Sequence, residues 1–448
     1  MDTVDLIATP DPEPSASAGP VLASERIVSL DVLRGVAVLG ILVMNIYGFA
    51  MPFIAYANPL AMGGTELHNI GTWFFTHIIF DQKFLSIFAM LFGAGLVLMT
   101  GRAEARDAKY GRIFYRRQFW LLILGAVHGY LIWFGDILFM YAVIGMMVFL
   151  FRNRQPRTLI IIACLLLPIA LFMSYGMSEY VKKTQAEVIE LTALQEAGEV
   201  LTEEQEKTLK DWEETRAFMA PTDEDLRKDI EAYSGTYLDI VAHRAPIVFS
   251  MQVFTTLFYG ISRVAALMLI GMALMKLGVL TGERPSAFYR NLMLGGYLIG
   301  LPLTVFSAFN LYAHDFDQQY VIRVGGIANY IGSLIVAFGH IGLVMLLVQS
   351  GAIKRVLQKF AAVGRMALTN YLMHSVILTT LFYGYGLGLY GEIPRFWQMG
   401  FVIGVILLQM IISSWWLSRY RFGPVEWLWR SLTYWRRQPM RSNAIVQT

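Results

Sequence analysis

Charge is scarce in this sequence. Charged residues make up 15% of the 448-residue chain, whereas hydrophobic residues make up 56%; soluble domains contain roughly 25% charged residues. So little charge excludes an ordinary soluble enzyme, and so much apolar and aromatic surface excludes an intrinsically disordered chain. The net charge of +3 is too small, and the basic residues are too scattered, to indicate a nucleic-acid partner. The composition indicates an integral membrane protein surrounded by the lipid bilayer.

Cysteine is nearly absent as well. The single cysteine, Cys164, lies in an apolar run, so the chain forms neither an intrachain disulfide nor a cysteine metal cluster. The seven histidines are scattered and none belongs to a His-Glu-x-x-His pattern, which argues against a zinc hydrolase. The sequence contains neither a glycine-rich dinucleotide fingerprint nor a Walker-type phosphate loop. We therefore expect no metal site and no tightly bound cofactor.

Ten apolar stretches dominate the rest of the chain, and a helix needs about 20 mostly apolar residues to cross a membrane. Helices 1–5 are expected within residues 25–177 and helices 6–10 within residues 246–422. The stretches fall near residues 32–53, 71–100, 118–134, 137–151, 158–177, 246–281, 287–312, 321–349, 364–391 and 396–418. We predict an all-α polytopic membrane protein with about ten transmembrane helices.

The positions of Lys and Arg predict the orientation, because basic residues near the ends of spans stay on the cytoplasmic side. Placing the N-terminus inside puts most of the 36 basic residues in cytoplasmic segments, including the runs at 102–117, 354–365 and 419–441. Arg395 is then the only basic residue in the short outer loops. We therefore predict that the N and C termini are both cytoplasmic.

Three segments lie outside the predicted spans. Residues 1–24, rich in proline and small residues, are expected to form a disordered cytoplasmic tail, and residues 423–448 a cytoplasmic basic tail. Residues 178–245 form an acidic extracytoplasmic insertion with the composition of solvated helices, in which Thr202 begins a capping box and Thr222 is a helix N-cap. This insertion is either a helical cap on the outer face or a lid or docking surface for an external substrate.

Ionisable side chains in the spans are candidates for function, because each costs about 2.5–3.5 kcal/mol or more at the centre of a membrane helix. Asp31 and Arg34 are three residues apart at the inner end of the first span, where they form either a structural ion pair or part of a site. Asn45, in the outer half of this span, makes either a hydrogen bond to another helix or a contact with substrate.

A second polar group interrupts the second span. His77 and Asp81 are four residues apart, so the carboxylate could fix the imidazole tautomer, while Lys83 would neutralise a group on another helix. The group is either a site or a buried brace. A broken or re-entrant helix would fit here, since non-helical backbone at membrane depth is tolerated around a cavity.

The strongest signal lies in residues 124–138. His128 falls in the outer half of the third span, and Asp136 occupies a short turn. If the helix continued to Gly135, the two side chains would lie roughly 12 Å apart along its axis. His128 is suited to act as a general base or a transient acyl carrier, with a carboxylate orienting its other nitrogen; the alternative is a core histidine bonded to a carbonyl. Whether His77 or His128 is the reactive histidine stays open.

The later spans contain five more polar side chains at depths where water or a partner is required: Arg263, Arg323, His340, Asn370 and His374. The two arginines would either contact an anion or pair with Asp81 or Asp136. The two histidines are more typical of packing than of ligand binding.

Several sequence blocks resemble the YeiB family of bacterial inner-membrane proteins, whose domain has no known function. They are residues 30–42 with Asn45, 83–96, 128–129 with 135–138, 363–372 and 423–430. The resemblance covers nearly the whole chain. It implies a multi-pass protein of the bacterial inner (plasma) membrane.

The first of these blocks also resembles the start of transmembrane acyltransferases such as heparan-alpha-glucosaminide N-acetyltransferase. Those enzymes move an acyl group from cytoplasmic acyl-CoA to extracytoplasmic glycans. By this resemblance Asn45 matches an asparagine of the first-span motif, and an outward-facing histidine would carry out the acyl chemistry.

We therefore hypothesise an acyltransferase that moves an acyl (acetyl) group from cytoplasmic acyl-CoA, its co-substrate, to an extracytoplasmic glycan or envelope acceptor. His128 would be the base or carrier, Asp136 its electrostatic partner, and Asn45 a polariser of the acyl carbonyl. Six residues are candidates for binding the substrate or acyl-CoA: Asp31, Arg34, Asp81, Lys83, Arg365 and Asn370.

Two other functions fit the same pattern. A secondary transporter of a small anionic molecule would use Arg263, Arg323 and Lys83 as charge partners, and five spans on each side of the insertion match the layout of inverted-repeat transporters. A non-catalytic scaffold or sensor would instead use the insertion at 178–245. The sequence specifies neither the substrate nor the oligomeric state.

Overall fold

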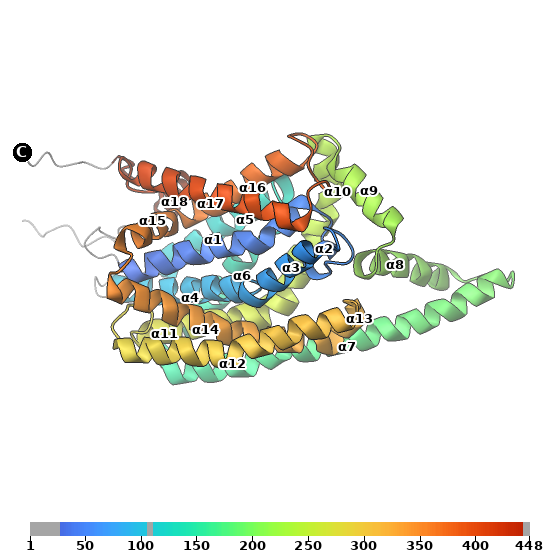
Figure 1. Cartoon of the computed structure of the whole chain (residues 1–448), viewed down its shortest axis with the longest axis horizontal. Helices are drawn as coiled ribbons and strands as arrows, with labels where there is room; N and C mark the ends of the chain where they lie inside the picture. The colour runs from blue at the N-terminus through green and yellow to red at the C-terminus, as the bar shows by residue number, and fades with distance from the viewer. Residues whose placement is uncertain (1–26, 105–110, 442–448) are drawn as a thin grey trace, which may run out of the picture.

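The computed structural model describes residues 27–104 and 111–441. Every element named within these ranges is a helix, and the β-bridge found there joins Tyr420 to Arg441. This confirms the all-α class. Most of the helices run along the long axis of the molecule as one bundle (Figure 1). The tail predicted for residues 1–24 lies outside the described residues, as does the end of the basic tail at 442–448.

The helices connect through short loops over most of the chain. In order they are α1 (Val28–Ala50), α2 (Ile54–Ala57), α3 (Leu67–Ile79), α4 (Lys83–Glu104), α5 (Gly111–Leu131), α6 (Leu138–Val148), the 3-10 helix η2 (Phe149–Phe151), α7 (Pro156–Glu196), α8 (Glu203–Met219), α9 (Asp223–Tyr233), α10 (Tyr237–Ser250), the π-helix η3 (Met251–Val264), α11 (Ala265–Lys276), α12 (Ser286–Ala313), α13 (Gln318–Tyr320), the π-helix η4 (Val321–Gly325), α14 (Ile327–Ser350), α15 (Lys354–Arg365), α16 (Ala367–Phe382), α17 (Arg395–Leu417) and α18 (Pro424–Tyr434).

Seven helical stretches of the described residues are long and apolar enough to cross a membrane, which confirms a polytopic membrane protein. They contain α1, α3–α4, α7, α10–α11, α12, α14 and α17. The three other expected spans correspond to α5, whose first turns carry three arginines, and to the shorter helices α6 and α16. Length and hydropathy thus support seven of the roughly ten spans predicted.

α1 lies inside the bundle, whereas α7 lies at its edge. In the apolar part of α1, 83% of the residues are buried within the protein, against 11% for α7. α1 packs so closely on α15 that a Cβ at Gly35 would collide with the carbonyl oxygen of Phe360, and one at Gly364 with that of Asp31. This contact brings Asp31 close to the end of α15. We call this end of the bundle the inner end, because the predicted orientation places it on the cytoplasmic side.

Two spans depart from a regular α-helix. The second is interrupted at residues 80–82, between α3 and α4, where Gln82 has a positive φ of 61°. The polar residues His77 and Asp81 lie at this interruption. The span after the insertion includes the 14-residue π-helix η3, and π-helical turns are frequent at functional sites.

The helices around the insertion extend beyond the bundle on the side opposite α15 and α18 (Figure 1). α7 continues without a break to Glu196, so the boundary expected at residue 178 lies within a helix, and the one expected at 245 lies within α10. The predicted capping box begins α8 at Thr202, and the predicted N-cap Thr222 begins α9, where it also forms a capping box with Asp225. At the second box, hydrogen bonds from Thr222 and the guanidinium of Arg216 lower the pKa of Asp225 to about 2.

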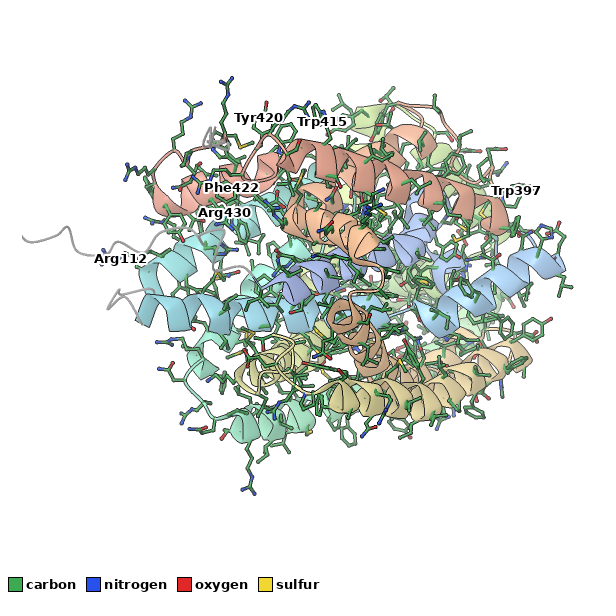
Figure 2. All side chains as sticks on the ribbon, turned by 60° about the vertical axis from the view of Figure 1, so that its left-hand side comes forward. Arg112, Trp397, Trp415, Tyr420, Phe422 and Arg430 are labelled. Carbon is green, nitrogen blue, oxygen red and sulfur yellow. The ribbon has the colours of Figure 1, made fainter. Side chains whose placement is uncertain are left out.

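Aromatic side chains mark both ends of α17. Trp397 lies at one end, and Trp415 lies near the other, with Tyr420 just beyond it (Figure 2). Both tryptophans are more than half exposed. Tryptophan and tyrosine are enriched where a bilayer meets water, so α17 has the pattern of a helix that spans the bilayer at the surface of the bundle. At the inner end, Phe422 and Arg430 lie close together, with the guanidinium 4.6 Å from the ring centroid (Figure 2).

Candidate active site

A buried histidine joins an aspartate and a serine from separate parts of the chain. His128, in the last turn of α5, has Nδ1 2.8 Å from Oδ1 of Asp136 and Nε2 2.8 Å from Oγ of Ser375 on α16. An ionised carboxylate only accepts hydrogen bonds, so Nδ1 donates to Asp136 and Nε2 accepts from the hydroxyl of Ser375. We call these three residues the His128 triad. Serine, histidine and aspartate bonded in this order are suited to acyl transfer.

The expected separation of His128 and Asp136 is wrong, because the helix ends earlier than the sequence suggested. α5 ends at Leu131 rather than near Gly135, and the loop that follows turns back on the helix. Asp136 therefore lies beside His128, where its second oxygen, Oδ2, accepts the backbone N–H of Phe139 at 2.8 Å.

Three contacts hold this loop in place. The indole of Trp133 donates to the carbonyl of Gly48 on α1 at 3.1 Å. On the outer side, the buried guanidinium of Arg244 on α10 donates to the carbonyl oxygens of Tyr130 and Ile132 at 3.0 and 2.5 Å. The carbonyls at the end of α5 are thus satisfied by side chains from another helix, and the orientation of His128 depends on packing from α1 and α10.

The triad is closed to solvent. His128 is 1% exposed and Ser375 is 0% exposed. Tyr371, one turn before Ser375 on α16, packs edge-on against the His128 ring with centroids 5.2 Å apart, and its hydroxyl donates to the carbonyl of Gly135 at 3.2 Å. Tyr371 also lines a cavity at the inner end of the bundle. Its side chain therefore contacts both the triad and the cavity.

This cavity has a volume of about 290 Å³ and is lined by α1, α4, α5, α16 and α18, among other segments. Its acidic lining residues are Asp31 and Glu426, and Asp31 pairs with Arg34 at 3.2 Å. The excess of arginine suits an anion, above all the oxygens of a phosphate. Five arginines line the cavity: Arg34, Arg117, Arg365, Arg421 and Arg430.

α18 forms one wall of the cavity and is fixed to its neighbours by two of its side chains. Glu426 accepts the backbone N–H groups of Leu368 and Thr369 at 2.7 and 3.0 Å, so it caps the start of α16. The indole of Trp429 donates to the carbonyl of Arg117 at 2.9 Å, and the guanidinium of Arg117 lies 3.7 Å from the Trp429 ring centroid. The block at 423–430 therefore shapes the basic cavity.

Three of the six predicted binding residues, Asp31, Arg34 and Arg365, line this cavity. Asn370 does not line it. The Asn370 amide is buried and donates to the carbonyl of Val363 at 3.1 Å and to the hydroxyl of Ser413 at 3.0 Å, which ties α16 to α15 and α17.

Asp81 and Lys83 belong to a separate cluster and do not line the cavity either. Asp81 accepts hydrogen bonds from Asn329 at 2.7 Å and Tyr56 at 3.2 Å, and its Oδ2 lies 3.2 Å from Nδ1 of His77. Lys83 donates to the amide oxygen of Asn329 at 2.8 Å and to the carbonyl of His77 at 2.6 Å. This cluster braces α3 and α4 against α14 across the break in the second span.

Among the residues that the structure describes, none of the five polar side chains predicted in the later spans bonds to the triad. The buried Arg263 donates to the carbonyl of Tyr330 and to the hydroxyl of Ser333, both at 2.8 Å, and Arg323 pairs with Glu179 at 3.1 Å. The alternative that these arginines pair with Asp81 or Asp136 is therefore wrong. The two histidines have packing partners, His340 the hydroxyl of Tyr297 and His374 the amide of Gln409.

Asn45 is half-buried on α1, one turn before Gly48, and makes no side-chain hydrogen bond with the residues that the structure describes. Ser375 and Tyr371 were not among the residues predicted from the sequence. Tyr371 lies in the block at 363–372, and Ser375 follows it by four residues, which places both on one face of a helix. That spacing was the available signal, but nothing in the sequence indicates that His128 packs against this face.

The comparisons with known proteins find bacterial relatives that match this chain over nearly its whole length. The chain is 31% identical over 449 residues to the uncharacterized protein YxaH of Bacillus subtilis (strain 168), covering 96% of this chain and all of the relative. It is 32% identical over 410 residues to the uncharacterized protein YeiB of Escherichia coli (strain K12), covering 91% of this chain and 96% of the relative. A family model described as a protein of unknown function (DUF418) matches residues 274–436. No solved structure matches.

The fold defines the class of this protein as a polytopic α-helical membrane protein, here with a basic cavity beside a buried histidine triad. Its similarity to these relatives extends over nearly the whole chain. The chain belongs to the YeiB family.

Proposed function

We propose that this protein is a transmembrane acyltransferase that takes an acyl group from cytoplasmic acyl-CoA and passes it to an extracytoplasmic glycan or envelope acceptor. The observation that carries the proposal is the position of Tyr371, which lines the arginine-rich inner cavity and also packs on His128. A donor with several phosphates at one end and a reactive thioester at the other fits a basic cavity next to a histidine.

The cavity would bind the phosphates of CoA. Arg365 lies at the end of α15, and Arg34 faces the same space from α1. Arginine binds phosphate with two parallel hydrogen bonds, and such charge-assisted bonds are roughly twice as strong as neutral ones. The amide oxygen of Gln118, which also lines the cavity, is buried with no hydrogen-bond partner among the described residues. It is available to accept an N–H group from the amide-containing arm of CoA.

His128 would act as the general base. Its Nδ1–H donates to Asp136, so Nε2 has the free electron pair that removes a proton from an attacking hydroxyl. Asp136 holds the ring in this tautomer and stabilises the positive charge that forms when Nε2 is protonated. In a bacterial inner (plasma) membrane with both termini cytoplasmic, the cavity would face the cytoplasmic pool of acyl-CoA.

The test uses membrane vesicles from a bacterium that expresses the protein, since these carry the envelope glycans. With radiolabelled acetyl-CoA, the wild-type protein is expected to label the glycan fraction, and the His128→Gln and His128→Ala variants to label it at least about 100-fold more slowly. His374→Gln, an equally buried histidine on α16, is the matched control and should retain transfer. Undiminished transfer by both His128 variants would remove His128 from the mechanism, and absence of acetyl-CoA binding by purified wild-type protein would overturn the proposed function.

A further inference from the structure

Ser375 is the one member of the His128 triad that the proposed function leaves without a chemical role. Its hydroxyl lies 2.8 Å from Nε2 of His128, and its side chain is completely buried. A buried hydroxyl needs a hydrogen-bond partner, but a carbonyl oxygen within α16 would satisfy it, as one does for Thr379. Instead the hydroxyl is directed at the imidazole nitrogen that acts as the base.

We propose that Ser375 is the nucleophile of this reaction, and that the acyl group crosses the protein as an ester on Ser375 Oγ. This inference rests on the proposed function, because it requires a thioester donor. Ser375 is then the transient acyl carrier, a role predicted from the sequence for His128. His128 then acts only as the base.

The reaction balances with the groups present. In the first step Ser375 Oγ attacks the thioester carbonyl carbon, the Oγ–C bond forms, His128 Nε2 takes the hydroxyl proton, and the C–S bond breaks. The sulfur of CoA leaves with that proton as a thiol. In the second step a hydroxyl of the acceptor glycan attacks the serine ester and gives its proton to His128. The C–Oγ bond breaks, and Ser375 takes the proton back.

The position of Ser375 suits a relay between the two faces of the membrane. Leu368 and Tyr371 line the inner cavity, and Ser375 is seven residues beyond Leu368, so all three lie along one side of α16. Seven residues correspond to roughly 10 Å along a helix. An acyl group moved from the cavity to Ser375 has therefore travelled away from the inner end, and it reaches Ser375 when the Tyr371 ring turns aside.

An amide donor lies beside the triad. Nε2 of Gln252, in the π-helix η3, is buried without a hydrogen-bond partner among the described residues. A methyl group at Gly129, the residue after His128, would lie 3.0 Å from this nitrogen and 3.7 Å from Cβ of Asp136. Gln252 therefore packs on the same helical turn as the triad. It is placed to donate a hydrogen bond to the oxygen of an acyl group held there, a role that the sequence analysis gave to Asn45.

Covalent labelling tests the proposal directly. The purified full-length protein is mixed with acetyl-CoA in the absence of acceptor, quenched with acid, digested and analysed by mass spectrometry. The wild-type protein is expected to gain the mass of one acetyl group on the peptide that contains Ser375. Ser375→Ala should lose this label and slow transfer to glycan by at least about 10³-fold. Ser375→Cys should take up the label as a thioester that neutral hydroxylamine removes.

Ser413→Ala is the matched control, because Ser413 is also fully buried, on the neighbouring α17, but bonds to Asn370 instead of a histidine. It should label as the wild-type protein does. Size-exclusion chromatography and acetyl-CoA binding check that each variant is folded. If Ser375→Ala binds acetyl-CoA and transfers at the wild-type rate, or if the acetyl group is found on His128, Ser375 is not the nucleophile and the proposed function stands. If the wild-type protein binds no acetyl-CoA and transfers nothing, both proposals are wrong.

Discussion

Two buried histidine–aspartate pairs in this molecule differ in their surroundings. At the break in the second span, Asp81 lies 3.2 Å from His77 and also bonds to Tyr56 and Asn329. At the end of α5, Asp136 lies 2.8 Å from His128. Among the described residues, Asp136 otherwise accepts a hydrogen bond from the backbone N–H of Phe139.

The two pairs differ in whether a cation other than the histidine lies near the aspartate. Lys83 is fully buried and bonds to Asn329, which also bonds to Asp81, so the cluster at His77 already contains a cation near its carboxylate. Among the described residues, no lysine or arginine lies within ion-pair distance of Asp136. An imidazolium formed at His128 therefore meets a carboxylate that no other cation neutralises. The first arrangement is suited to stabilising the fold, and the second is suited to stabilising the imidazolium that the proposed reaction would form.

The sharpest test of this comparison replaces each aspartate with asparagine. Asp136→Asn is expected to slow acetyl transfer by about 10³–10⁴-fold, because the amide no longer fixes the tautomer in which Nε2 is the base. Binding of acetyl-CoA should stay within about twofold of wild type, since Asp136 does not line the cavity. Rates and binding are measured on the same purified preparations.

Asp81→Asn is the matched control, because it makes the same change at the other pair. It should lower the melting temperature of the protein and leave the transfer rate of the folded fraction close to wild type. If Asp81→Asn slowed transfer as much as Asp136→Asn without loss of folded protein, the distinction drawn between the two pairs would fail.

The next largest effect is expected from Lys83→Met. Removing the buried ammonium leaves the carboxylate of Asp81 without its nearby cation, which should lower the free energy of unfolding by about 3–5 kcal/mol. The double variant Asp81→Asn with Lys83→Met should recover part of this loss, because it removes both charges. Thermal unfolding in detergent measures the difference, and a Lys83→Met protein as stable as wild type would show that the cluster is not a brace.

Much of the fold could be predicted from the sequence. Runs of apolar residues indicate the membrane spans, and residues that form capping hydrogen bonds indicate where helices begin. The apolar stretches and the capping boxes at Thr202 and Thr222 are signals of this local kind.

The triad was predicted only in part. His128 and Asp136 are eight residues apart and were recognisable as partners, but Ser375 lies 247 residues from His128. Only the packing of α16 against α5 and its loop brings them together.

The close contact of His128 and Asp136 could not be predicted either, although the two residues are near each other in the sequence. Leu131 and Gly135 both belong to an apolar sequence that would continue a helix, so hydropathy does not indicate where α5 ends. The helix ends where a side chain from a helix distant in sequence satisfies its last carbonyl groups. Arg244 on α10 donates hydrogen bonds to the carbonyl oxygens of Tyr130 and Ile132. A helix end determined by a residue more than a hundred positions away leaves no local pattern to read.

The smallest expected effect separates binding from chemistry at the cavity itself. Arg365→Ala should weaken the binding of acetyl-CoA about tenfold, which corresponds to about 1.4 kcal/mol, through the loss of a phosphate contact. Transfer at saturating acetyl-CoA should change little, because the His128 triad is intact. Arg323→Ala is the control, since that arginine pairs with Glu179 outside the cavity and should leave binding unchanged. Equal losses in both variants would indicate a nonspecific effect of charge, and an unchanged Arg365→Ala protein would show that this arginine does not contact the phosphates.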